Sequence, residues 1–302
     1  MKTIQIKQVD AFTTIPFGGN PAGVVTDAMG LTTDEMQRIA KEMNLSETAF
    51  VFPSNDQNAD YFIRFFTPKS ELPLAGHPTI ATVHALIEEG KIVLDSSHKV
   101  IWQETQAGTL PIEIDSESDG SYTITMTQSM PKFETLTFSP EHLAKMLGID
   151  EAYIDIRYPV QKVSTGIYWL VVPVVNLAAM QKMRPNLDAV ANLSRSEILT
   201  GITAFSMETE DPKCDMHART FAPNEGVAED PVCGTGNGCL GAYAVENDII
   251  HCEGKITLTN EQGIELNRPG KVYVTVEGKA KKITKIQVGG KAITVLEGIM
   301  RF

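Results

Sequence analysis

"RTFAPNEGVAEDPVCGTGNGCLGAY", residues 219–243, repeats the outline of an earlier stretch, "RFFTPKSELPLAGHPTIATVHAL", residues 64–86. Each stretch opens like a strand, passes through a loop, and reaches a glycine turn followed by the small and apolar residues of a helix. The opening arginines are 155 residues apart, and the turn glycines Gly76 and Gly234 are 158 apart. The sequence therefore predicts a duplicated fold of two similar halves, with a three-residue insertion in the second loop.

Alternation of apolar and polar residues, which is typical of strands, dominates the rest of the chain. Examples are "TIQIKQVDAF" (residues 3–12), "DYFIRFF" (60–66), "KVSTGIYWLVVPV" (162–174) and "KVYVTV" (271–276). The alternation stops in "QSMPKFETLTF", residues 128–138, so we place the seam between the halves there. The predicted domains are residues 1–130 and 131–302, with a last strand that is free to cross back to the first domain.

Helix signals are fewer than strand signals. Thr32 and Glu35 form a capping-box pattern, which predicts a helix from there to about Met43. Ser139 and Gly148 are the expected N-cap and stop of a second helix, and the two glycine turns each begin another. Two sets of strands around few helices indicate the α+β class rather than an alternating βαβ array.

The composition is that of a globular protein. The chain has 302 residues, of which 42% are hydrophobic and 21% charged, and its formal net charge of −12 argues against non-specific binding to nucleic acid or an anionic membrane. No apolar run approaches the roughly 20 residues that cross a bilayer, and the start lacks the apolar core of a signal peptide. The four cysteines, all in the last third, are expected to be free thiols, so we predict a cytoplasmic protein.

The two glycine turns are candidate anion sites. Gly76 in the first turn, and Gly234 and Gly236 in the second, leave backbone N–H groups bare where a helix begins. If the two termini face each other across an inter-domain cleft, they can hold one anionic ligand from both sides. A glycine before a helix is also typical of a plain turn, so this alternative stays open.

Nucleotide and zinc sites fit the second turn poorly. "GTGNG" is not the GxGxxG fingerprint, and the chain contains no GxxxxGK[ST] motif. Cys233 and Cys239 lack the CxxC spacing of a zinc knuckle and have no second cysteine pair to join them. We therefore expect no metal and no cofactor.

Three residues near these turns are candidate proton carriers. Glu47, in "NLSETAFV", begins an apolar strand, where scarce water should raise its pKa toward that of a general base, although most such residues are solvated caps. His77 lies at the first helix terminus and is either an acid–base group or a surface residue. Asp230 precedes a proline, which favours an extended backbone beside the second terminus. His217, in "CDMHARTF", is expected to be an ordinary strand residue.

Four stretches together resemble one family, the PhzF-like isomerases of phenazine biosynthesis. They are "DAFTTIPFGGNPAGVV" (10–25), "NLSETAFV" (44–51), "FFTPKSELPLAGHPT" (65–79) and "FAPNEGVAEDPVCGTGNG" (221–238), in the family's order and spacing. The resemblance implies the diaminopimelate epimerase-like fold, an α+β duplication in which each domain is a curved, barrel-like, mostly antiparallel sheet wrapped around a central helix. It also implies a homodimer.

The resemblance assigns roles to individual residues. The family's glutamate, which falls on Glu47, shuttles a proton during the cofactor-free isomerisation of a dihydro-hydroxyanthranilate. His77 and Asp230 complete the implied catalytic set. The implied substrate-binding residues belong to the "NLSE" motif and the two turns, which would hold the substrate carboxylate: Ser46, Gly76, Gly234, Thr235 and Gly236.

The related epimerases use one cysteine before the glycine of each turn. Here Cys233 fills the second position, whereas Ala75 fills the first, so a two-thiol mechanism lacks one partner. Near a helix terminus the Cys233 thiolate is expected to be favoured and reactive. We expect an isomerase that moves a proton within a small carboxylated metabolite, and the alternatives are a cysteine-type epimerase relative or a non-catalytic protein that binds small anions.

Overall fold

The computed structural model describes residues 1–302, which divide into two compact units. The first unit contains Met1–Met126 together with Gly289–Phe302, and the second contains Thr127–Val288. The chain therefore passes between the units twice, once after residue 126 and once after residue 288.

The first unit is built on a mixed sheet with the strand order β18–β1–β2–β3–β4–β6–β7–β8. The pairs β2–β3 and β4–β6 are parallel, the other neighbours are antiparallel, and the short β5 pairs with β4. The strands are β1 (Thr3–Ala11), β2 (Asn20–Val25), β3 (Glu47–Phe52), β4 (Tyr61–Phe66), β5 (Glu71–Leu72), β6 (His98–Thr105), β7 (Gly108–Ser116), β8 (Tyr122–Thr127) and β18 (Ala292–Arg301).

The second unit repeats this pattern with the order β9–β10–β11–β12–β13–β15–β16, in which β11–β12 and β13–β15 are parallel and β14 pairs with β13. Its strands are β9 (Lys132–Thr135), β10 (Gln161–Ser164), β11 (Tyr168–Pro173), β12 (Gly201–Ser206), β13 (Met216–Ala222), β14 (Val227–Asp230), β15 (Glu253–Gln262), β16 (Gly270–Lys279) and β17 (Lys282–Gly290). Part of the stretch where we expected strand structure to stop is thus the strand β9.

The first unit takes one strand from the end of the chain. β18 follows β17 of the second unit but pairs with β1 of the first, and β9 pairs with β10 within the second unit. β9 therefore has the same place beside β10 that β18 has beside β1. The shared pairing pattern confirms the predicted α+β duplication.

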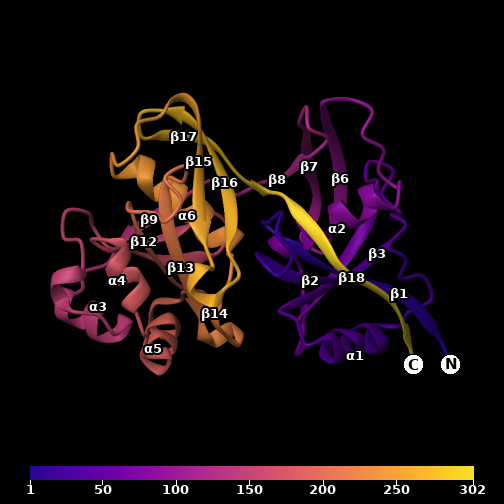
Figure 1. Cartoon of the computed structure of the whole chain (residues 1–302), viewed down its shortest axis with the longest axis horizontal. Coiled ribbons are helices and arrows are strands. Elements are labelled where there is room, and N and C mark those ends of the chain that lie inside the picture. Colours follow the sequence, from indigo (N-terminus) through magenta and orange to yellow (C-terminus); the bar gives the residue numbers. More distant parts are fainter. The chain divides into compact units, whose positions relative to one another are not determined.

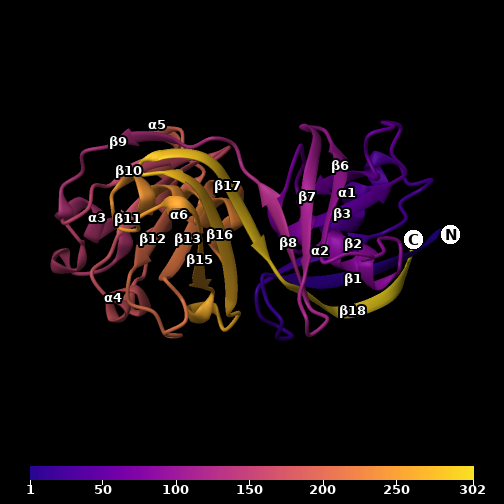
Figure 2. The ribbon, with the colours of Figure 1, turned by 90° about the horizontal axis from the view of Figure 1, so that it is seen from above.

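One buried helix fills each curved sheet. α2 (Gly76–Glu88) contacts β1, β2, β3 and β18, and α6 (Gly234–Glu246) contacts β10, β11, β12 and β16 (Figures 1 and 2). Both helices begin at the predicted glycine turns, and most of their residues are buried. A helix that is apolar on all sides is stable only when it is enclosed, which explains why each sheet curls around one.

The remaining helices lie on the other face of each sheet. α1 (Thr33–Met43) has the predicted Thr32–Glu35 capping box, and α3 (Pro140–Leu147) has the predicted Ser139 N-cap and a left-handed Gly148. Sequence analysis missed α4 and α5, although each has an asparagine N-cap as a local signal. The elements not yet given are α4 (Leu177–Lys182), α5 (Leu187–Glu197) and the short 3-10 helices η1 (Glu151–Tyr153), η2 (Pro223–Glu225) and η3 (Ile264–Leu266).

Each half carries the same arginine–carboxylate pair. Arg64 on β4 donates to both carboxylate oxygens of Glu71, at 2.6 and 2.7 Å, and Arg219 on β13 does so to Glu229, at 2.8 Å for both. Such two-pronged pairs are strong and geometrically specific. They fix the loop before the buried helix in both halves of the duplication.

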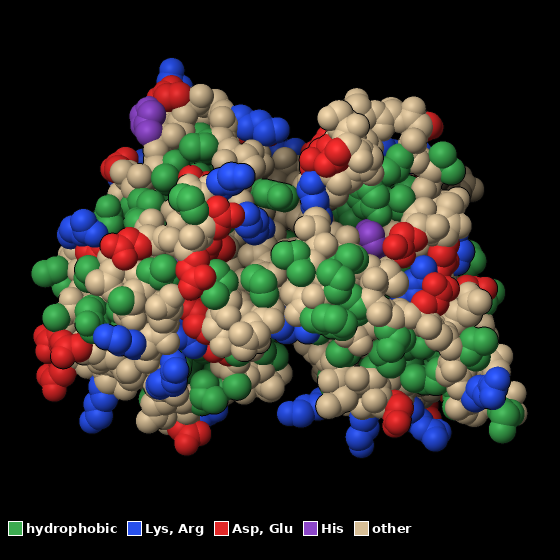
Figure 3. Space-filling model, in the orientation of Figure 1, with side chains coloured by type: hydrophobic (Ala, Val, Ile, Leu, Met, Phe, Trp, Pro, Cys, Tyr) green, Lys and Arg blue, Asp and Glu red, His purple; other side chains and the backbone are tan.

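The surface mixes side chains of both charge signs. Figure 3 shows acidic, basic and apolar side chains interspersed on the face of both units that it presents. No helix of the structure is long and apolar enough to cross a membrane.

Candidate active site

Glu47 is the first residue of β3, and the end of α1 places it there. The helix ends at Met43, and Asn44 follows in the left-handed conformation with a φ of 53°. This turn leads through Ser46 to Glu47, where a largely buried strand begins. Asparagine tolerates a left-handed backbone better than most residues, so the "NLSE" motif favours the turn.

The Glu47 carboxylate lies against the His77 ring. Glu47 Oε2 is 3.2 Å from His77 Nε2, and the two side chains are 18% and 10% exposed. The Ser46 hydroxyl lies 3.3 Å from the same ring nitrogen. Oε2 itself makes no hydrogen bond, although it lies this close to the ring nitrogen. The structure thus brings three predicted site residues together.

Burial sets the proton affinity of Glu47. It raises the pKa of this carboxyl to about 7, and the hydrogen bond with Ser46 lowers it by a smaller amount. The upward shift is the one expected from the sequence. A carboxyl group with a pKa near neutrality both takes and returns protons at neutral pH, which general acid–base catalysis requires.

The first turn of α2 carries His77 and has no side-chain cap. α2 begins at Gly76, and its N-cap Ala75 makes no side-chain hydrogen bond. A Cβ atom built on Gly76 would meet nothing within 4 Å, so the backbone is open on that side. Uncapped N–H groups and the helix dipole favour an anionic group at such a position.

The equivalent turn of the second unit holds the other predicted residues. Asp230 ends β14, and its Oδ1 accepts a backbone N–H two residues later at 3.2 Å. Cys233 is the N-cap of α6, with Sγ accepting the Gly236 N–H at 3.4 Å. Trp169 Nε1 donates to Thr235 Oγ1 at 3.1 Å. The capped terminus of α6 therefore differs from the uncapped terminus of α2.

Two glycines shape the start of α6. Gly234 is its first residue, and a Cβ atom on Gly236 would lie 2.7 Å from the Thr203 hydroxyl oxygen. That distance is too short for any side chain, so Gly236 is required by the close approach of β12. Packing thus accounts for Gly236, and its predicted role in substrate binding stays a prediction.

Our expectation of a reactive Cys233 thiolate is wrong. The side chain is buried, and burial raises the pKa of the Cys233 thiol well above its ordinary value, with the nearby Asp230 adding to the rise. The hydrogen bonds from Thr235 and the Gly236 N–H act in the opposite direction but are smaller. Desolvation therefore outweighs the helix terminus at this position.

A buried amide network that sequence analysis missed supports this turn. Gln262 accepts the Cys233 N–H at 3.3 Å and the Asn237 side chain at 2.8 Å, and donates to the Asp230 carbonyl at 2.8 Å. Asn260 donates to Asn237 at 3.0 Å. The one available signal was Asn237, a polar residue within an otherwise apolar helix.

The two halves are not chemically equivalent at the Glu47 position. Thr48 pairs with Phe66 in the first unit, and Ile202 pairs with Phe221 in the second, so Gly201 takes the place of Glu47. A Cβ atom on Gly201 would lie 2.0 Å from a backbone oxygen, which excludes any side chain. The carboxylate at the Glu47 position therefore exists only in the first unit.

Comparisons with known proteins agree with the fold and the motifs. The model of a family described as phenazine biosynthesis-like protein matches residues 9–298. A Clostridium acetobutylicum protein named as an uncharacterised isomerase is 37% identical over 300 residues, 98% of each chain. The trans-2,3-dihydro-3-hydroxyanthranilate isomerase of Pseudomonas fluorescens is 31% identical over 290 residues, 96% of each chain.

The crystal structure of a Bacillus anthracis phenazine biosynthesis protein of the PhzF family is 38% identical, covers 100% of both chains and gives a TM-score of 0.92. The chain therefore belongs to the PhzC–PhzF family, as its motifs suggested. Its relatives also confirm the prediction that it is an isomerase.

Proposed function

We propose that the protein is a cofactor-independent isomerase that moves a proton within a small carboxylated metabolite, with Glu47 as the acid–base group. The observation that carries this proposal is the Glu47 carboxyl, buried beside His77 with its pKa raised to about 7. An ordinary carboxyl group is fully ionised at neutral pH, whereas one with a pKa near 7 is present in both forms. The environment of Glu47 therefore favours proton transfer over a purely structural role.

The proposed reaction is a proton shuttle without net oxidation. The Glu47 carboxylate takes a proton from one carbon of the substrate, and the electron pair left behind delocalises toward an adjacent double bond. Glu47, now neutral, returns the proton to a second carbon, and a double bond shifts. Burial favours the neutral form of Glu47, so it helps the first step, in which the carboxylate gains a proton. The second step restores the carboxylate, and a pKa near neutrality keeps its cost small.

His77 and the open terminus of α2 would orient the substrate. The His77 ring lies within 3.3 Å of both Ser46 and Glu47, where it can hold the carboxyl group in one position. The uncapped N–H groups at Gly76 would donate hydrogen bonds to the substrate carboxylate. Binding by Asp230, Gly234, Thr235 and Gly236, and hence a site that uses both halves, stays a prediction from the family resemblance.

The substrate class follows from the relatives and from the helix terminus. The Pseudomonas fluorescens relative is named for a dihydro-hydroxyanthranilate, which is a small carboxylated ring. A substrate of this kind carries both an anionic group for the terminus and carbon atoms that can lose a proton. The cysteine-type epimerase is disfavoured, because Ala75 replaces one thiol and burial raises the pKa of the other. The cytoplasmic location and the homodimer stay predictions.

The test is a screen for proton exchange. Small carboxylated metabolites are incubated with the protein in deuterated water, and mass spectrometry measures deuterium uptake. We expect at least one ring carboxylate to exchange with wild type and not with Glu47→Gln. The matched control is Glu42→Gln, an exposed carboxyl on α1. Uptake that is equal in wild type and Glu47→Gln would contradict the proposal and leave the anion-binding alternative.

A further inference from the structure

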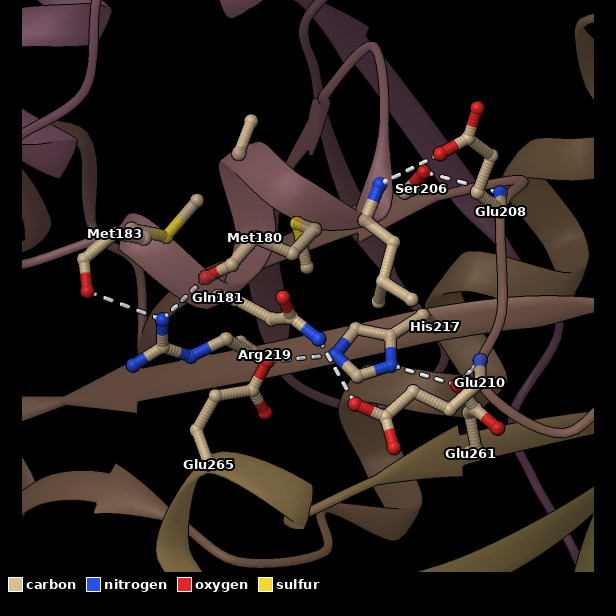
Figure 4. Close-up of polar contacts among 12 residues, drawn as sticks. Met180, Gln181, Met183, Ser206, Glu208, Glu210, His217, Arg219, Glu261 and Glu265 are labelled. Atoms are coloured by element: carbon tan, nitrogen blue, oxygen red, sulfur yellow. Dashed lines mark hydrogen bonds and ion pairs between the residues drawn. The ribbon is translucent and has the colours of Figure 1, made fainter.

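A second cluster of ionisable residues lies in the second unit, apart from every residue assigned above. His217 on β13 is fully buried, with Nδ1 2.8 Å from Glu261 Oε1 and Nε2 2.9 Å from Glu265 Oε1 (Figure 4). The expectation that His217 is an ordinary strand residue is therefore wrong. Parallel pairing of β13 with β15 sets His217 opposite Glu261, and η3 supplies Glu265.

The charges of this cluster do not cancel. A ring that donates to two carboxylates must be protonated on both nitrogens, and the two hydrogen bonds raise the pKa of His217 to about 9 although burial alone would lower it. Both oxygens of Glu261 have donors, because Oε1 also accepts the Glu210 N–H at 2.7 Å and Oε2 accepts the Asp211 N–H at 2.9 Å. One imidazolium against two carboxylates leaves one negative charge.

One carboxylate oxygen of the cluster lacks a hydrogen-bond donor. Glu265 Oε2 is buried and makes no hydrogen bond, and the Glu265 side chain is only 10% exposed. Figure 4 shows one oxygen of this carboxylate facing the ring and the other turned away from it. Buried carboxylate oxygens nearly always have a partner, since an unmet one is strongly unfavourable.

Glu265 lines a cavity of about 720 Å³, far more space than one water needs and within the range of small-molecule sites. The wall consists of the segment between α4 and α5 together with parts of β13, β14 and η3. Its carboxylates are Glu210, Glu229 and Glu265. The buried Arg219 in the wall is already used, because it pairs with Glu229 and donates to two backbone carbonyls at the end of α4.

The fold does not require this arrangement. In the first unit Phe62 pairs with Glu104 at the ladder position that His217 and Glu261 occupy in the second. An apolar ring thus occupies the equivalent position in the sheet of the first unit. The buried imidazolium and the unmet carboxylate are therefore particular to the second unit.

We propose that this cavity binds the ammonium group of a small organic amine, which donates a hydrogen bond to Glu265 Oε2. A cation fits because the three carboxylates of the wall outnumber its two arginines, Arg184 and Arg219. Arg184, whose side chain is exposed and lines the same cavity, would add a contact for amines that also carry a carboxylate. The proposal does not depend on the isomerase function.

The test is a nuclear magnetic resonance titration of the full chain at pH 7 and constant ionic strength. The probes are n-butylammonium, 4-aminobutyrate and butyrate, which carry an ammonium group, both groups and a carboxylate only. We expect saturable shifts of the Glu265, Asn267 and Glu210 amides with the first two and none with butyrate. Tighter binding of 4-aminobutyrate would assign a contact to Arg184. Absence of shifts with n-butylammonium, or equal shifts with butyrate, would overturn the proposal.

Two variants make the titration specific. Glu265→Gln should weaken n-butylammonium binding about ten-fold or more, the loss expected for one charge-assisted hydrogen bond. Ala228→Trp fills the cavity from its exposed rim without touching the cluster, and should abolish binding even if Glu265→Gln unfolds. The matched control Glu225→Gln, exposed in η2, should bind as wild type does. Unchanged affinity in a folded Glu265→Gln or in Ala228→Trp would contradict the assignment.

Discussion

At the scale of single residues, the proton affinities of the site depend on where water is excluded. The same physical effect, desolvation, raises the pKa of Glu47 to about 7 and that of the Cys233 thiol well above its ordinary value. For a carboxyl group the shift moves proton exchange toward neutral pH, whereas for a thiol it moves exchange away from it. Burial thus brings proton exchange of the Glu47 carboxyl to neutral pH and keeps the Cys233 thiol protonated there.

Glu47→Gln should retain the shape of the side chain and lose turnover. An amide cannot accept the proton, so kcat should fall by about 10²–10⁴ or more, while substrate binding changes little. In wild type, kcat/KM should rise with pH through about 7, because the free enzyme must hold Glu47 as the base. The measurement is steady-state kinetics over a pH series with the substrate found by the exchange screen. Retained turnover in Glu47→Gln would show that another residue is the base.

The same carboxyl should make stability depend on pH. Its pKa is about 7 when folded and near 4.5 when unfolded, so between these values the folded state holds the extra proton and stability falls as pH rises. Glu47→Gln removes this effect and should be more stable than wild type by about 1–3 kcal/mol at pH 8, with the gap closing toward pH 5. Urea unfolding at both pH values tests this, and a gap that is constant with pH would argue against the shifted carboxyl.

Cys233→Ala should keep activity within a few-fold, since the isomerase mechanism gives the thiol no part in proton transfer. The loss of the weak cap on the Gly236 N–H should lower stability by about 0.5–1 kcal/mol. In folded wild type the thiol should react slowly with iodoacetamide at pH 8, and rapidly after denaturation. A dead Cys233→Ala variant that remains folded would instead indicate an epimerase-like mechanism.

At the scale of elements, the sequence predicts the features that depend only on residues close together in the chain. The capping box of α1 and the glycine turns before α2 and α6 were predictable because each depends on residues within a few positions. The cluster of His217, Glu261 and Glu265 was not, because its members are 44 and 48 residues apart and meet only through parallel pairing of β13 with β15. No local pattern marks such a contact. The raised pKa of Glu47 was predictable in direction because an apolar strand follows it directly.

The junction between α1 and β3 gives an element-scale prediction. Asn44 is left-handed, with a φ of 53°, and its turn places Ser46 and Glu47. Asn44→Gly should therefore be nearly neutral for stability and kcat, whereas Asn44→Val should lower the free energy of unfolding by about 1–2 kcal/mol and reduce kcat, because a branched side chain resists this backbone. Urea unfolding and kinetics of the two variants test the point. Equal behaviour of Gly and Val would mean that the turn does not position Glu47.

At the scale of the whole molecule, a duplicated chain has kept one fold in both halves but carries different ionisable residues in each. The equivalent positions hold Glu47 against Gly201, and Phe62 against His217. The shared features are those that build the sheet, such as the arginine–carboxylate pairs of Arg64 and Arg219. The repeat could be read from the sequence through these shared features. The sequence left the return of β18 to the first unit open, because alternation of apolar and polar residues marks a strand without marking its pairing partner.

The strand β18, which returns to the first unit, gives the last prediction. It pairs with β1 along nine residue pairs, from Thr3 with Arg301 to Ala11 with Ala292. It thereby covers the edge of β1, a strand that contains the buried Ile4 and Ile6. A chain that ends at Gly290 keeps β17 but leaves β1 as a bare edge over an exposed core. Hydrogen exchange measured by mass spectrometry should show lost protection in Met1–Met126, whereas Thr127–Val288 should stay largely protected.

A synthetic peptide of residues 291–302, added in excess, should restore the protection by strand addition, and a scrambled peptide should not. If the shortened chain keeps full protection of the first unit, β18 is dispensable for the edge of that sheet. If both units lose protection together, each half depends on the other for folding. In that case the return of β18 to β1 links the two units into one cooperative molecule.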